Sequence, residues 1–155
     1  MPDRTDILLL QLLERDASRT TKELAAEVGL AMSSTHDRLK ALRSRGTLKG
    51  SHAEVDPKAF GAHVQALLMI ELSRQRRETV DGFLDDLGQM ACVRDAFHVT
   101  GRYDLIVHVF ARDMQDLKAV ELDHFTSHPA VARVETSIIF DSRRRFETPY
   151  CLPAD

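Results

Sequence analysis

Residues 20–29, TTKELAAEVG, predict a short helix whose beginning and end are both marked in the sequence. Thr20 and Glu23 have the spacing of a capping box, in which each side chain accepts a hydrogen bond from the backbone N–H of the other residue. Gly29 follows the last apolar position, and glycine commonly ends a helix because it adopts the left-handed conformation without strain. With a further helix expected over 32–45, this tight turn predicts a helix-turn-helix.

The helix expected over 32–45 has one packing side and one polar side. On a helical wheel Thr35, Leu39 and Leu42 share the packing side. The opposite side carries Ser33, Ser34, Asp37 and Lys40. Small polar and basic side chains can approach base edges in the major groove of DNA. The same pattern is also typical of a solvent-facing helix in a small bundle.

Further DNA contacts are expected around this polar side. Arg38 lies on its flank and would engage phosphates together with the backbone amides behind Thr20 and Thr21. His36 either contacts DNA or packs against the preceding helix. A single domain of this kind makes few contacts, so the predicted partner is a pseudo-palindromic site in double-stranded DNA that a dimer binds.

The charge distribution is compatible with nucleic-acid binding, although the whole chain has a formal net charge of −3. Residues 1–50 carry nine basic and seven acidic side chains, whereas residues 51–155 carry twelve and seventeen. Residues 31–50 alone have five basic side chains and one acidic one. Because charges are screened beyond a Debye length of about 8–10 Å, a locally basic helix on an acidic protein can still bind phosphates.

The second half of the 155-residue chain predicts a separate domain over 62–142. Apolar residues alternate with period two from Val64 to Leu72, which is typical of a strand. The remaining predicted elements are helix faces over 80–87 and 114–120 and strands over 92–100, 103–111 and 131–140. The order βαββαβ is that of a ferredoxin-like fold. A linker at 51–61 precedes this domain and a C-terminal tail at 143–155 follows it.

The composition fits a folded protein without membrane, disulfide or metal features. The chain is 43% hydrophobic, and no apolar run approaches the ~18 residues of a membrane span. Cys92 and Cys151 form neither a disulfide framework nor a metal cluster, and no cofactor is expected. His124 and His128 have i, i+4 spacing, but no glutamate lies between them as in a zinc protease. No signal peptide or membrane partner is predicted, so the expected location is the cytoplasm.

Five motifs, in order along nearly the whole chain, resemble those of the Lrp/AsnC (feast/famine) family of transcriptional regulators. They are Asp3-x-x-Asp6-x-x-Leu9-Leu10-x-x-Leu13, then Glu23-Leu24-Ala25 with Val28-Gly29-Leu30, then Arg38-Leu39-x-x-Leu42-x-x-x-Gly46, then Gly50-x-x-Ala53-x-x-Asp56-Pro57-x-x-Phe60-Gly61, and finally Thr100-Gly101-Arg102-Tyr103-Asp104. The resemblance implies an α+β chain with an N-terminal winged helix-turn-helix DNA-binding domain at 1–50. It also implies that the ferredoxin-like domain is a ligand-sensing domain, called RAM.

The resemblance further implies that an amino acid or similar effector binds at residues 100–104. Gly101 lacks a side chain, so backbone amides there can approach a ligand carboxylate, and Asp104 can receive the ligand's ammonium group. Arg102, where the family often has an acid, would favour an acidic or polar ligand if it points inward. The other candidates are Thr100, Tyr103 and, on the last strand, Thr136 and Ser137. The alternative is a hairpin turn in which Gly101 only supplies a positive φ angle.

The same resemblance implies that two sheets pack face to face in a homodimer, and that dimers assemble into tetramers or octamers. The second face of the first strand carries Leu67 and Met69 and is apolar enough for such an interface. The family usually has Ser at the position of Ala31, where it would cap the third helix. Capping therefore passes to Ser33 or is weaker here.

A catalytic function is not expected, because the sequence holds no phosphate-binding loop and no nucleophile elbow. Siroheme decarboxylases resemble the same family but act on a tetrapyrrole. In such an enzyme His98 and His108, on adjacent predicted strands, would be the candidate residues. The intact capping box, glycine turn and basic face of the N-terminal domain favour a regulator instead. An architectural DNA-binding protein without an effector is the other alternative.

Overall fold

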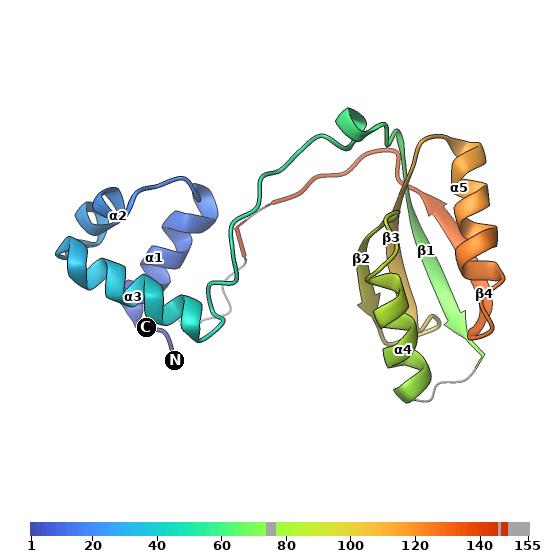
Figure 1. Ribbon diagram of the computed structural model, residues 1–155, viewed down its shortest axis with the longest axis horizontal. Helices are drawn as coiled ribbons and strands as arrows, with labels where there is room; N and C mark the ends of the chain where they lie inside the picture. Colours follow the sequence, from blue (N-terminus) through green and yellow to red (C-terminus); the bar gives the residue numbers. More distant parts are fainter. Residues whose placement is uncertain (74–76, 146, 149–155) are drawn as a thin grey trace. The chain divides into compact units, whose positions relative to one another are not determined.

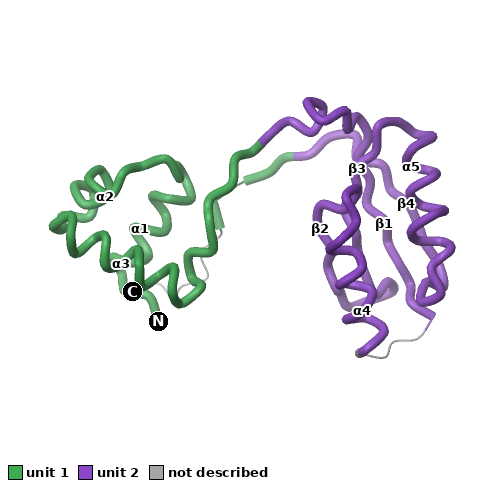
Figure 2. Tube along the Cα trace, viewed as in Figure 1, with its two compact units in different colours: residues 1–54, 143–155 green, residues 55–142 purple. Residues whose placement is uncertain are grey.

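The computed structural model describes residues 1–73, 77–145 and 147–148. The chain forms two compact units (Figure 2). Unit 1 consists of residues 1–54 together with the C-terminal segment that starts at Arg143, and unit 2 consists of residues 55–142.

The C-terminal segment contacts the first helix of unit 1, α1 (Arg4–Arg15). Arg15 Nε donates to Glu147 Oε1 at 3.1 Å, and the backbone N–H of Thr148 donates to Glu14 Oε2 at 3.3 Å. The sequence predicted these residues as a separate tail, whereas the structure groups them with the helical unit. The chain therefore passes between the two units twice.

Unit 1 contains three helices, and the second and third begin and end close to the predicted residues (Figure 1). After α1 come α2 (Thr21–Val28) and α3 (Met32–Ser44). Thr20 and Glu23 form the predicted capping box of α2, and Gly29 ends that helix with φ 67°. No strand is assigned in the described part of unit 1, so the segment after α3 does not form the strands of a wing there.

Each helix of unit 1 buries an apolar side against the other two. Leu9, Leu24 and Leu39, one from each helix, are at most 3% exposed. Thr35 is also buried, as the helical wheel predicts, and its hydroxyl donates to the Ala31 carbonyl at 3.1 Å. Ala31 is the N-cap of α3 and no side chain caps this helix. Of the two expected alternatives, the weaker capping is the one observed.

Unit 2 has the predicted ferredoxin-like architecture, an antiparallel sheet with helices on one face (Figure 1). The strands are β1 (Val64–Leu72), β2 (Val93–His98), β3 (Leu105–Ala111) and β4 (Val131–Ile138), in the spatial order β2-β3-β1-β4. The helices are α4 (Arg77–Leu87) and α5 (Met114–Val120), and a 3₁₀ helix at Pro57–Phe60 precedes β1. α5 continues directly into a π-helical turn, η2 (Glu121–Thr126), which the sequence pattern does not reveal.

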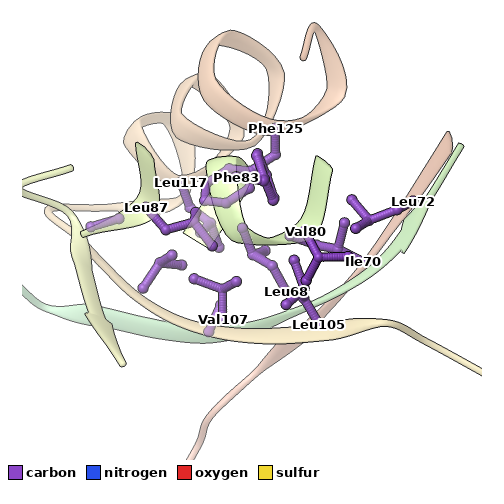
Figure 3. Close-up of a cluster of buried hydrophobic side chains, with 13 residues drawn as sticks. Leu68, Ile70, Leu72, Val80, Phe83, Leu87, Leu105, Val107, Leu117 and Phe125 are labelled. Carbon is purple, nitrogen blue, oxygen red and sulfur yellow. The ribbon is translucent and has the colours of Figure 1, made fainter. Parts of the chain in front are cut away.

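The core of unit 2 lies between the two helices and one face of the sheet. Leu68 and Ile70 of β1 and Val107 of β3 are fully buried on this face. Phe83 of α4 and Phe125 of η2 pack against them from the helical side (Figure 3). Each such side chain contributes about 1.5–3 kcal/mol by its burial. This packing fixes which residues of the neighbouring β2–β3 hairpin face the helices.

Candidate DNA-binding face and effector cavity

The outer side of α3 carries five of the predicted DNA-contact residues. They are Ser33, Ser34, His36, Asp37 and Lys40, and all five are exposed. The His36 side chain is 66% exposed and its Nδ1 lies 3.7 Å from Asp37 Oδ1, so it does not pack against α2. The structure thus gathers these polar side chains on one accessible helix face, hereafter the α3 face.

Arg38 has an intramolecular role that the sequence did not predict. Its Nη1 lies 2.6 Å from Asp3 Oδ2 and 2.8 Å from Asp6 Oδ1, which ties α3 to the start of α1. The hydrogen bonds that Arg38 donates, first to Asp3 and then to Asp6, raise the pKa of Arg38. Asp3 and Asp6 also cap α1 through each other's backbone N–H. The expected phosphate contact of Arg38 stays a prediction, beside this observed positioning role.

Thr20 is occupied in the cap of α2. Its hydroxyl donates to Glu23 Oε2 at 2.8 Å and accepts from the Glu23 backbone N–H at 3.3 Å. The Thr20 backbone N–H is the main cause that lowers the pKa of Glu23. Thr21 is the first residue of α2. The backbone amides of this helix start, rather than the Thr20 hydroxyl, are therefore the groups suited to a phosphate.

A cavity of about 550 Å³ lies in unit 2 beside α4 and the turn of the β2–β3 hairpin. Its lining residues are Val80, Asp81, His98, Val99, Thr100, Gly101 and Asp104. Small-molecule sites typically have volumes of about 300–1,000 Å³, so a small ligand fits here. Three of the seven predicted effector residues, Thr100, Gly101 and Asp104, are brought together in this effector cavity.

Asp104 anchors the hairpin turn to β1. Its Oδ2 accepts a hydrogen bond from the Leu72 backbone N–H at 2.7 Å, and its own backbone N–H donates to the Ile70 carbonyl at 2.9 Å. Gly101 has φ 121°, which residues with side chains rarely adopt, and open space surrounds the position of a Cβ. Gly101 therefore supplies the positive φ of a turn and also leaves the backbone accessible at the cavity.

Arg102 and Tyr103 are not part of the effector cavity. The Tyr103 hydroxyl donates to the Glu135 carboxylate, and this hydrogen bond is the main cause that raises the pKa of Tyr103. Glu135 pairs with Met69 in the sheet, so it lies on the face opposite the helices. The Arg102 guanidinium lies 5.2 Å from the centre of the Tyr103 ring. To bind an acidic ligand in the cavity, the Arg102 side chain would have to line it. Arg102 is not among the lining residues.

Thr136 and Ser137 lie away from the cavity on β4. Thr136 Oγ1 donates to Glu121 Oε2 at 2.7 Å and so connects β4 to η2. Ser137 pairs with Leu67 and lies on the opposite face of the sheet. Neither residue lines the cavity.

Four residues that line the cavity were not predicted as effector residues, namely Val80, Asp81, His98 and Val99. Val80 marked an apolar helix face and is 6% exposed, as that pattern predicts. The only sequence signal at His98 was a histidine on an expected strand, which did not indicate an effector site. Asp81 gave no sequence signal, because only the packing of α4 beside the hairpin brings it to the cavity.

His98 and His108 lie on opposite faces of the sheet. His98 pairs with the buried Leu105, whereas His108 is on the open face, with Nε2 3.1 Å from Gln65 Oε1. The described residues include no group of three or more potential metal ligands placed to hold an ion. No described helix is long and apolar enough to cross a bilayer. The two histidines therefore do not meet in one site of this chain.

Comparisons with known proteins match both units. Residues 3–43 match the AsnC-type helix-turn-helix domain, and residues 65–148 match the Lrp/AsnC ligand binding domain. The transcriptional regulator AzlB of Bacillus subtilis is 34% identical over 145 residues, which cover 94% of this chain and 92% of AzlB. The HTH-type transcriptional regulator AldR of Mycobacterium tuberculosis is 32% identical over 142 residues, which cover 92% of this chain and 79% of AldR. A transcriptional regulator of Neisseria meningitidis, solved in complex with L-methionine, has a TM-score of 0.84 at 26% identity and covers 94% of both chains.

A helix-turn-helix unit joined to a ligand-binding domain defines a transcriptional regulator that binds DNA and a small molecule. The chain belongs to the Lrp/AsnC family of these regulators. Its relatives are named as transcriptional regulators, and nothing in the comparisons supports a decarboxylase.

Proposed function

We propose that this chain is a cytoplasmic, sequence-specific regulator that binds pseudo-palindromic DNA as a homo-oligomer and responds to an amino acid. The effector cavity carries the proposal, because it lies in the part of the chain that matches the ligand-binding domain. That a similar regulator forms a complex with L-methionine supports an amino acid as the class of ligand.

The α3 face supplies the DNA contacts in this proposal. Ser33, Ser34 and Lys40 approach base edges in the major groove, and the helix start at Thr21 approaches a phosphate. The exposure of these side chains supports this role. Arg38 holds α3 against α1 and so orients the face.

The effector cavity can receive both charged ends of an amino acid. Backbone N–H groups at Gly101 are donors for the carboxylate, and the Asp104 carboxylate is an acceptor for the ammonium group. An ionised carboxylate has about four lone-pair sites, so Asp104 can accept more than one hydrogen bond.

The open face of the sheet is the proposed dimer interface. Leu67 and Met69 of β1 and Ile106 and Phe110 of β3 are half-buried there, and Phe97 of β2 is 52% exposed. Met69, Ile106 and Phe97 are neighbours across the three strands, and an accessible apolar surface of this kind commonly marks an interaction site. Two helix-turn-helix units in one dimer can then read two half-sites of DNA.

The test is binding of the full chain to its own promoter fragment, measured by fluorescence anisotropy with and without each proteinogenic amino acid. We expect tight binding and a change in affinity with at least one amino acid, which also raises the melting temperature. The variant Gly101→Leu should lose this response and keep DNA binding. Gly61→Leu is the matched control, because Gly61 also has positive φ but does not line the cavity.

Two results would contradict the proposal. Absence of promoter binding would remove the regulatory function itself. Promoter binding that no amino acid alters, with no change in melting temperature, would leave an architectural DNA-binding protein without an effector.

A further inference from the structure

The effector cavity contains two carboxylates, although an amino-acid zwitterion has only one ammonium group. Asp104 comes from the hairpin and Asp81 from α4, and both line the same cavity. Asp104 is 9% exposed and is held in place by β1, whereas Asp81 is exposed. Once one carboxylate receives the α-ammonium group, the other faces the remainder of the ligand.

The cavity wall around the second carboxylate is largely polar. His98 and Thr100 line the same cavity as Asp81, and the apolar contribution comes from Val80 and Val99. An ionised carboxylate only accepts hydrogen bonds, while imidazole and hydroxyl groups can donate or accept. An apolar ligand side chain would displace the water that hydrogen-bonds to these groups and would offer no hydrogen bonds in its place. Such desolvation is unfavourable.

A negatively charged side chain fits this wall poorly. Carboxylates brought close together repel each other, so a ligand carboxylate beside Asp81 would raise the energy of the complex. The guanidinium of Arg102, the one basic group of the 100–104 motif, does not line the cavity.

We infer that Asp81, assisted by His98, selects an effector whose side chain ends in an N–H group, namely an ammonium, guanidinium or carboxamide. This inference rests on the proposed function and names the ligand class of the same cavity. Asp81 is then a specificity-determining residue. Asp104 binds the α-ammonium group and the Gly101 backbone binds the α-carboxylate, which all amino acids share.

Four probes of similar length test the inference by calorimetry on the full chain. L-lysine and L-glutamine carry N–H groups, L-methionine is apolar and L-glutamate is anionic. We expect the tighter of L-lysine and L-glutamine to bind at least tenfold more tightly than L-methionine and L-glutamate. Equal or tighter binding of L-methionine or L-glutamate overturns the inference but leaves an amino-acid sensor in place.

Variants of α4 test whether Asp81 causes the preference for ligand side chains that end in an N–H group. Asp81→Asn should weaken binding of the tighter of L-lysine and L-glutamine at least tenfold and leave the melting temperature of the ligand-free protein nearly unchanged. Asp85→Asn is the control, because Asp85 is exposed on the same helix and does not line the cavity. An unchanged affinity of Asp81→Asn for that ligand overturns the role of Asp81. Failure of all four probes to bind also overturns the inference, while DNA binding by the full chain is decided separately by the promoter assay.

Discussion

Arg38 and Asp6 join the third helix to the first, with Arg38 Nη1 2.8 Å from Asp6 Oδ1. The Asp6 side chain is 11% exposed and that of Arg38 35%, so the pair is only partly in contact with water. Asp6 Oδ2 also accepts from the backbone N–H of Asp3 at 3.2 Å, which is part of the cap of α1. One carboxylate therefore stabilises a helix end and orients the helix that carries the α3 face.

Replacing Asp6 with Ala should lower the free energy of unfolding by about 1–2 kcal/mol, because two hydrogen bonds are lost and Arg38 loses one of its partners. Chemical denaturation followed by circular dichroism measures this change. Asp37→Ala, an exposed change on α3, is the control for stability. Equal stability of the Asp6→Ala and wild-type proteins would contradict the structural role of the pair.

Acid should destabilise unit 1 through its helix caps. The Asp6 backbone N–H, followed by Arg38, lowers the pKa of Asp3 below its ordinary value of 3.8, and the Thr20 backbone N–H lowers that of Glu23 below 4.5. A carboxyl group whose pKa is lowered by folding stabilises the fold fully above its unfolded-state pKa. It loses that contribution as pH falls through its folded-state pKa.

The melting temperature should therefore fall as pH drops below about 4.5, with part of the loss continuing below about 3.8. In Glu23→Gln, which has no charge to titrate at this cap, the dependence on pH should be shallower. Thermal melts at constant ionic strength measure both slopes. The same slope in both proteins would show that the α2 cap does not contribute.

Restoring a capping side chain at Ala31 should stabilise α3. Ala31 already has the extended backbone of an N-cap, with φ −64° and ψ 147°, so serine fits without strain. Ala31→Ser should raise the free energy of unfolding by about 1 kcal/mol, since its hydroxyl can accept from a backbone N–H of the first turn. The control Ala26→Ser, inside α2, should be neutral or slightly destabilising. Thermal denaturation of the three proteins compares them directly.

Lys40→Ala should weaken promoter binding. The loss should be about 1–3 kcal/mol if Lys40 contacts a base, whereas loss of a phosphate contact lowers the salt slope by about one unit. Fluorescence anisotropy across a salt series separates the two cases. Lys118→Ala, on the exposed side of α5, is the matched control. Wild-type affinity and slope in Lys40→Ala would exclude Lys40 from the DNA-binding face.

Met69→Asp should dissociate the proposed dimer, because it places a charge in the centre of the open sheet face. We expect the dissociation constant of the dimer to rise on the order of a hundredfold, which corresponds to a loss of about 3 kcal/mol of association free energy. Sedimentation equilibrium measures the assembly, and Met114→Asp, at an exposed methionine on α5, is the control. A dimer of unchanged stability in Met69→Asp would place the interface elsewhere.

The fold was largely predictable because its signals are local. The capping box at Thr20 and the stop at Gly29 are readable in the sequence, and strict alternation marks β1. The π-helical turn at Glu121–Thr126 was not predictable, because its apolar spacing resembles a continued α-helix. The placement of the C-terminal segment on α1 depends on contacts between residues more than a hundred positions apart.

The candidate site was predictable only in part, because its parts come from different elements. The hairpin motif named Thr100, Gly101 and Asp104, and these three residues line one cavity, whereas their role in effector binding stays a prediction. Adjacent residues of one motif can still face opposite sides of the sheet, and Tyr103 does so. Asp81 reaches the cavity through tertiary packing alone, which no local pattern records.

The helical unit is not a contiguous stretch of sequence, so a single crossover in the gene cannot exchange it between relatives. A recombinant that joined residues 1–54 to another ligand-binding domain would separate Glu14 and Arg15 from Thr148 and Glu147. Keeping these contacts requires two crossovers, so that residues 1–54 and the segment that starts at Arg143 come from the same parent. Natural or engineered hybrids of this protein should therefore inherit their first and last segments as a pair.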